Sequence, residues 1–260
     1  MPQQMPASKM RRLPVLFRAK PAVKRVLRFA SAVVALGTLS GCQGIVSSPI
    51  LSQIRVIVAS ADSGGLDIYE NTALVVPNLG FGTITSYVPT NPGTYTFSAK
   101  SAGTAQVLTS TKATLAASGQ YTILIGDSAA SLQQIIVKDQ SQAAPTGQIA
   151  LRFINENTVL GGLDVYLVPS GQTLLTVSPV YTNLTLSVNT GYLNVPTGTY
   201  TLVMVPTGTV PASTTIATYA GAQVTYSSGS ATTFVLINQQ LVTTPGLKVL
   251  TATDYVTPGN

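Results

Sequence analysis

The chain carries the same stretch of sequence twice, and this duplication constrains its fold more than any other feature. Residues 55–69 align without gaps on residues 152–166, and both segments contain Gly-Gly-Leu-Asp. Residues 86–97 align in the same way on residues 191–202, and both contain Gly-Thr-Tyr-Thr. We therefore expect two homologous domains with the same fold.

The spacing between the copies places the domain boundaries. The offset grows from 97 residues in the first matched block to 105 in the second, so the second copy has an eight-residue insertion between about residues 167 and 182. The polar segment between the copies is rich in breaker residues, which predicts a linker. The predicted organisation is a signal peptide (1–41, with a lipobox at 39–42), a tether (42–52), a first domain (53–139), a linker (140–147), a second domain (148–254) and a tail (255–260).

Both copies consist of short segments with strand composition, and no helical period is sustained after the leader. The predicted strands are 54–59, 94–99, 120–125 and 134–138 in the first copy, and 149–154, 199–205, 232–237 and 247–250 in the second. Alternation places Tyr95 and Phe97, and likewise Tyr200 and Leu202, on inward faces. Because about 90 residues with about seven strands make one Greek-key sandwich, we predict an all-β fold of two tandem Ig-like/Greek-key β-sandwich domains.

The basic residues gather at the start of the chain. Eight of the 14 Lys and Arg residues precede residue 29, and no acidic residue does. The rest of the chain has six basic and eight acidic residues, so its net charge is about −2. Nucleic acid is excluded as a partner, because binding it needs Lys and Arg clustered on the folded body. The chain also has no His and a single Cys, which removes the commonest general base and any internal disulfide.

The start of the chain is typical of an export signal. The apolar run at 29–39 is too short to span a membrane, which takes about 20 residues. The segment from Leu39 to Cys42, Leu-Ser-Gly-Cys, resembles the lipobox of bacterial lipoproteins. This resemblance implies cleavage before Cys42 and acylation of Cys42, which would anchor the protein to a membrane. By the same resemblance, Gln43 favours the outer membrane of the cell envelope; the alternative is a secreted protein with an accidental cysteine.

The second copy resembles a family of exported bacterial proteins. It contains Val-Pro-Thr-Gly-Thr-Tyr at 195–200, after Leu-Asp-Val-Tyr at 163–166. These segments are similar to those of the family catalogued as domain of unknown function 4397, whose members are exported, often lipid-anchored, and built of tandem β-sandwich units. The resemblance covers residues 53–254 and implies no activity. The first copy departs from the pattern, because Pro92 directly precedes Gly93.

Matched polar residues indicate either a structural motif or a polar site used twice. Arg55 and Asp67 recur as Arg152 and Asp164. If the intervening turn forms a hairpin, each Arg lies near the Asp of its own copy as a cross-strand pair. The complete predicted motif is Arg55, Asp67, Gly93 and Tyr95 in the first copy, and Arg152, Asp164, Gly198 and Tyr200 in the second.

Three tyrosines are the candidate ligand-binding residues: Tyr87, Tyr181 and Tyr192. Exposed tyrosine rings can stack on sugars, and Tyr181 lies in the insertion, where loops carry variable function. The alternative is that such tyrosines bury their rings and bond their hydroxyls to nearby backbone.

No constellation for catalysis or metal binding stands out. Of the neighbouring acids Asp62, Asp67 and Glu70, only one is repeated, so no metal and no cofactor is predicted. Glu156 and Asp164 are the one carboxylate pair considered for glycosidase chemistry. We predict a non-enzymatic envelope protein that acts as a scaffold or adhesion module, with an envelope protein or a glycan as partner. The alternative is a small-ligand or glycan-binding lipoprotein, with the ligand between the domains or beside residues 170–190.

Overall fold

The computed structural model describes residues 50–240 and 246–256. The predicted signal peptide, the lipobox, Cys42 and most of the tether lie outside the described residues. The described residues belong to one compact unit, Ser47–Asn260. None of their helical segments is long and apolar enough to cross a membrane.

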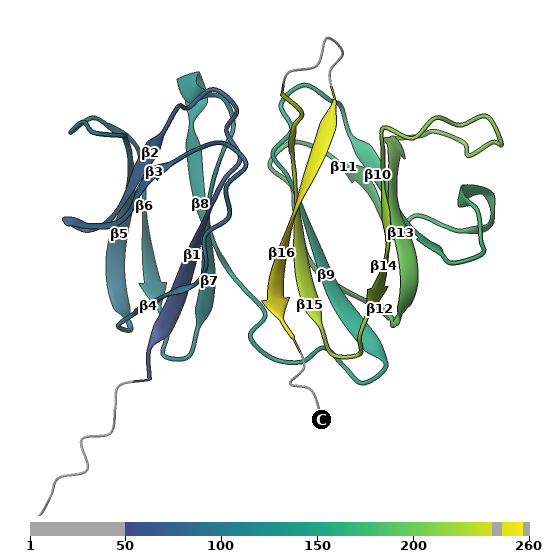
Figure 1. Cartoon of the computed structure of the whole chain (residues 1–260), viewed down its shortest axis with the longest axis horizontal. Coiled ribbons are helices and arrows are strands. Elements are labelled where there is room, and N and C mark those ends of the chain that lie inside the picture. Colours follow the sequence, from purple (N-terminus) through teal and green to yellow (C-terminus); the bar gives the residue numbers. More distant parts are fainter. Residues whose placement is uncertain (1–49, 241–245, 257–260) are drawn as a thin grey trace, which may run out of the picture. The chain divides into compact units, whose positions relative to one another are not determined.

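The first half of the described chain is a sandwich of two four-stranded sheets (Figure 1), ordered β4-β1-β7-β8 and β3-β2-β5-β6. The only helical element described between its strands is a single 3-10 turn, η1 (Ala129–Ser131). The strands are β1 (Ser52–Val58), β2 (Leu66–Glu70), β3 (Ala73–Leu79), β4 (Val88–Thr90), β5 (Gly93–Ser101), β6 (Val107–Leu115), β7 (Gln120–Gly126) and β8 (Gln133–Lys138).

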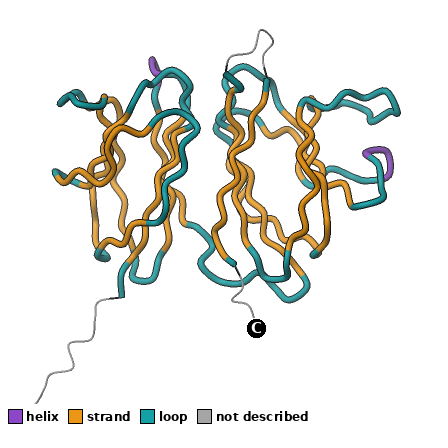
Figure 2. Tube along the Cα trace, viewed as in Figure 1, coloured by secondary structure: helices purple, strands orange, loops and turns teal. Residues whose placement is uncertain are grey.

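The second half repeats this arrangement strand for strand, in sheets ordered β12-β9-β15-β16 and β11-β10-β13-β14. Its 3-10 turn η2 (Leu174–Thr176) falls in the segment where the sequence predicts an insertion (Figure 2). The strands are β9 (Gln148–Asn155), β10 (Leu163–Pro169), β11 (Tyr181–Leu184), β12 (Asn189–Pro196), β13 (Gly198–Pro206), β14 (Tyr219–Tyr226), β15 (Ala231–Asn238) and β16 (Leu247–Tyr255).

The all-β fold of two sandwiches is confirmed, with one feature that the sequence did not predict. In each sandwich the two central strands of one sheet run parallel, β1 beside β7 and β9 beside β15. Parallel strands are usually covered on both faces and then have near-continuous apolar sequences. The burial of β7 and β15 along almost their whole length matches this expectation.

The sheets that contain these parallel pairs, which we call the inner sheets, pack against each other. On β1, Ile54 and Val56 face the core of the first sandwich, whereas Ile57 faces the second sandwich. Ile57 and Leu124 of the first sandwich cluster with Val235 of β15 and other apolar residues of the second. This apolar contact joins the two sandwiches.

The repeated Gly-Thr-Tyr segment has a packing reason. Tyr95 and Tyr200 lie against the cores of their sandwiches, as the alternation predicts, and each hydroxyl donates to a backbone carbonyl four residues earlier, at 2.9 and 3.0 Å. A Cβ atom at Gly93 or Gly198 would approach the tyrosine side chain to 3.2 or 3.0 Å. Glycine therefore leaves room for the tyrosine side chain two residues later.

Candidate functional site

Two arginines are buried where the inner sheets meet. Arg55 of β1 is 3% exposed and Arg152 of β9 is 2% exposed. Arg55 forms an ion pair with Asp254 of β16, in the other sandwich. Arg152 forms the reciprocal pair with Asp139, which follows β8. Each sandwich therefore supplies the cation of one ion pair and the anion of the other.

In the first sandwich, a threonine and a tyrosine complete the surroundings of Asp139. Thr122 Oγ1 accepts a hydrogen bond from Arg55 Nε (2.8 Å) and donates to Asp139 Oδ2 (2.6 Å). The Tyr87 hydroxyl donates to the same oxygen at 2.7 Å, and the Arg55 guanidinium lies 4.8 Å from the centre of the Tyr87 ring. Asp139 Oδ2 is also 3.6 Å from Arg55 Nη2.

The second sandwich reproduces these contacts around Asp254. Thr233 Oγ1 accepts from Arg152 Nε (2.9 Å) and donates to Asp254 Oδ2 (2.6 Å). The Tyr192 hydroxyl donates to Asp254 Oδ2 at 2.8 Å and accepts from the backbone N–H of Gln140 at 3.0 Å. The Arg152 guanidinium lies 4.6 Å from the centre of the Tyr192 ring. The eight residues form what we call the interface network: Arg55, Tyr87, Thr122, Asp139, Arg152, Tyr192, Thr233 and Asp254.

The interface network is electrically balanced, with two cations and two anions. Burial lowers the pKa of Arg55, but the carboxylates of Asp139 and Asp254 outweigh this effect and raise it. Burial also raises the pKa of Asp254, and Arg55 offsets part of that rise. Breaking a buried ion pair by removing one partner usually costs about 3–5 kcal/mol, because an uncompensated charge is left buried.

The predicted pairing of Arg55 with Asp67, and of Arg152 with Asp164, is wrong. β1 and β2 belong to different sheets, so Arg55 and Asp67 are not cross-strand neighbours. Asp67 instead accepts backbone N–H bonds from Asn78 (2.8 Å) and Gly103 (2.9 Å), which lower its pKa. Asp164 accepts the two matched bonds in the second sandwich. The repeated aspartates therefore hold turns.

The tyrosines proposed as ligand contacts lie in two different environments. Tyr87 and Tyr192 belong to the interface network, where an arginine covers one face of each ring. Tyr181 begins β11 and is half-buried against the core of the second sandwich. Ligand binding by these residues stays a prediction.

The other acidic candidates are engaged separately. Asp62 accepts the backbone N–H of Ala129 at 2.8 Å, and Glu70 accepts the hydroxyl of Thr90 at 2.9 Å. Within residues 50–240 and 246–256, no three metal-ligating side chains gather. Glu156 is buried against Gly126 of the first sandwich, and burial raises its pKa to about 7.

The sequence reasoning missed Asp139 and Asp254, the anions of the interface network. Asp139 directly follows β8 and Asp254 is the second-last residue of β16, and each lies two residues beyond the cross-strand partner of a threonine, Thr122 or Thr233. Extending the repeat alignment to the end of each copy would have revealed this match. It would not have shown that each aspartate pairs with the arginine of the other copy.

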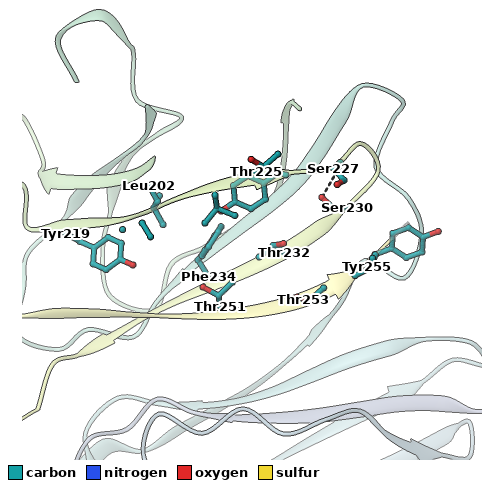
Figure 3. Close-up of a pocket in the computed structure, with 15 residues that line it drawn as sticks. Leu202, Tyr219, Thr225, Ser227, Ser230, Thr232, Phe234, Thr251, Thr253 and Tyr255 are labelled. Carbon is teal, nitrogen blue, oxygen red and sulfur yellow. Dashed lines mark hydrogen bonds between the residues drawn. The ribbon is translucent and has the colours of Figure 1, made fainter. Parts of the chain in front are cut away.

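A cleft of about 520 Å³ opens between β14 and β16 of the second sandwich (Figure 3). Leu202 and Phe234 line it from the core side, and Thr251 and Tyr219 line it from the two edge strands. Figure 3 shows the Tyr219 ring on the side of its strand that faces Phe234. The cleft is an open gap between the two sheets at their edge.

The matching edge of the first sandwich is closed. There Thr111 of β6 donates its hydroxyl to the backbone carbonyl of Gln134 on β8 at 2.7 Å. The buried Gln134 side chain crosses the gap and donates to the carbonyl of Phe97 at 3.1 Å. Ile136 of β8 packs against the core. The cleft therefore belongs to one copy of the repeat rather than to the fold.

Comparison with known proteins finds a family model that matches part of the chain. No curated protein sequence matches. Among solved structures, a family 26 carbohydrate-binding module from Eubacterium rectale in complex with maltoheptaose is 13% identical, covering 80% of this chain and 98% of its own, with a TM-score of 0.23. That likeness is too small to indicate a function. Residues 52–166, which comprise the first sandwich and the start of the second, match the family described as a domain of unknown function (DUF4397). The resemblance is supported over this part of the chain, and over residues 167–254 it stays a prediction.

Proposed function

We propose that this protein is a non-catalytic, lipid-anchored interaction module of the cell envelope, whose two sandwiches act as one rigid body. The interface network carries the proposal. Its reciprocal ion pairs join Arg55 to Asp254 and Arg152 to Asp139, so the sandwiches hold one fixed arrangement. A fixed pair of sandwiches suits a scaffold or adhesion role, because partners meet a surface that is already organised.

The side chains argue for binding rather than catalysis. The chain has no His to act as a general base. The carboxylates of Asp139 and Asp254 are buried and bonded to arginine, threonine and tyrosine, so neither is free to act on a substrate. Asp67 and Asp164 hold turns.

The anchor is proposed at Cys42, in the outer membrane. A palmitate analogue with a clickable tag should label the wild-type protein and not the Cys42→Ala variant, and the variant should leave the membrane fraction. Equal labelling of both proteins, or labelling of neither, would remove the anchor from the proposal.

The interaction role is tested in the producing cell. Deleting the gene should weaken surface adhesion or envelope integrity, and the wild-type gene should restore it. Arg152→Met, which disrupts the interface network, should restore less than Lys138→Met, a change at an exposed lysine beside it. If deletion leaves both properties unchanged, the scaffold role is wrong.

Small-ligand binding is the second candidate function, and the cleft favours it. A volume of about 520 Å³ falls within the usual range of ligand pockets, about 300–1,000 Å³. The cleft lies between β14 and β16 rather than at either place considered from the sequence.

A further inference from the structure

We propose that the cleft between β14 and β16 binds a neutral saccharide chain. This inference rests on the second candidate function, small-ligand binding, and names the class of ligand. Three observations support this assignment: the chemistry of the lining, the unpartnered tyrosine hydroxyls, and the closed counterpart in the first sandwich.

The lining combines apolar carbon with hydroxyl groups and contains no charge. Nine of the 15 described residues that line the cleft carry a hydroxyl, and the other six are apolar or glycine. A charged ligand would lose its hydration there without gaining a counter-charge. A purely apolar ligand would leave the hydroxyls without partners. A sugar ring offers both a C–H face for the apolar residues and hydroxyls for the polar ones.

Two of the hydroxyls are held in place without a partner. Tyr219 and Tyr226, at the two ends of β14, pack their rings against the core of the second sandwich. Across residues 50–240 and 246–256, neither hydroxyl makes a hydrogen bond. A tyrosine hydroxyl is protonated at neutral pH and can donate to a ligand. Burial, with a smaller contribution from Tyr219, raises the pKa of Tyr226 further. The rings are also suited to stack on a sugar.

The cleft arises from specific changes between the copies. The strand registers place Tyr121 and Ile136 of the first sandwich at the positions of Thr232 and Thr251 in the second. Tyr121 and Ile136 pack into the first core, and the Tyr121 hydroxyl accepts a backbone N–H at 2.9 Å. The second copy has a smaller, hydroxyl-bearing residue at both positions, so it gains space and polar groups together.

The test is calorimetric titration of the full-length protein with four neutral hexasaccharides: malto-, cello-, laminari- and chitohexaose. Oligogalacturonate serves as the acidic saccharide probe, and laurate, a carboxylate with a long apolar chain, serves as the lipid probe. At least one neutral hexasaccharide should bind. Thr251→Ile, which restores the residue type of the first sandwich, should weaken that binding at least about tenfold. Tyr226→Phe should weaken it about three- to tenfold, the usual effect of one hydrogen bond.

Tyr69→Phe is the matched control, because Tyr69 is a half-buried tyrosine of β2 in the first sandwich and does not line the cleft. It should leave affinity unchanged, and circular dichroism should show that all variants are folded. Binding that is unchanged in Thr251→Ile, or that is lost in Tyr69→Phe alone, would overturn the site. Binding of laurate or oligogalacturonate that is sensitive to Thr251→Ile, with no hexasaccharide binding, would overturn the saccharide assignment and keep the second candidate function. If no probe binds, both are wrong.

Discussion

The two sandwiches share their strand order and their common interface, yet they differ at one edge. In the first, Gln134 and Ile136 close the gap between β6 and β8. In the second, the same gap between β14 and β16 is an open cleft. The interface network constrains both copies equally, because each arginine needs the carboxylate of the other copy. The far edges carry no such constraint, so one of them could change.

The largest expected effect is on the interface network, where the copies should behave alike. Arg55→Met and Arg152→Met should each lower the free energy of unfolding by about 3–5 kcal/mol, because each leaves a buried aspartate without its ion-pair partner. Urea unfolding at pH 7 measures this, with Lys138→Met as the exposed control.

Adding Asp139→Asn to Arg152→Met should recover part of the loss, since it removes the unpaired charge. A loss below about 1 kcal/mol in either single variant would mean that the network does not hold the sandwiches together.

The next effect is expected in the second copy alone, because Glu156 aligns with Ala59 of the first copy, which cannot titrate. Burial raises the pKa of Glu156 from 4.5 to about 7; a backbone hydrogen bond from Asp127 lowers it slightly, and the Asp127 carboxylate raises it. The folded state therefore binds the proton more tightly than the unfolded state. Stability from this group is complete below pH 4.5 and is lost as the pH rises to about 7.

Glu156→Gln should accordingly stabilise the protein at pH 8 by up to about 3 kcal/mol and flatten the pH dependence between about pH 4.5 and 7. Asp254, whose pKa is also raised, leaves a remaining slope of the same sign. Glu70→Gln, at a half-buried surface position, is the control and should keep the full slope. Unfolding midpoints of the wild type and both variants, measured from pH 4 to 8, test this prediction. If Glu156→Gln keeps the wild-type dependence of stability on pH, the raised pKa of Glu156 is contradicted.

The tyrosines of the interface network should give smaller and unequal effects. Tyr87→Phe removes one hydrogen bond to Asp139 and should cost about 1.5 kcal/mol. Tyr192→Phe also removes the bond from the Gln140 N–H, so it should cost about 2 kcal/mol. Chemical denaturation of the two variants in parallel measures the difference, and a larger loss in Tyr87→Phe would reverse the expected order.

The smallest effects on stability are expected from two variants that give the edge of one sandwich the residue found at the matching position of the other. Ile136→Thr should destabilise the closed edge by about 1 kcal/mol, because Ile136 packs against the first core. Thr251→Ile should change stability by less than about 0.5 kcal/mol, since Thr251 is exposed in the cleft. Thermal unfolding of the two variants tests this difference between the edges. Equal losses of stability would show that the two edges are packed alike.

Much of the fold could be predicted because it depends on local pattern. Strand composition marked eight of the 16 described strands, among them the buried β7 and β15, and the repeat showed that one architecture is used twice. The strands that escaped prediction include β6 and β14, which lie at sheet edges and are rich in Thr and Ala. Edge strands with one solvated face have a weaker apolar signal than central strands.

Three features could be predicted from the amino-acid sequence alone, because they follow from backbone periodicity and short-range packing: the duplication, the all-β class and the inward faces of the Gly-Thr-Tyr strands. The pairing of Arg55 with Asp254, 199 residues away, rather than with Asp67, is visible only in the folded molecule, as is the open edge of the second sandwich. The ion pair depends on which sheets pack together, and the open edge depends on which side chains fill the gap between two sheets. Both involve residues far apart in the chain.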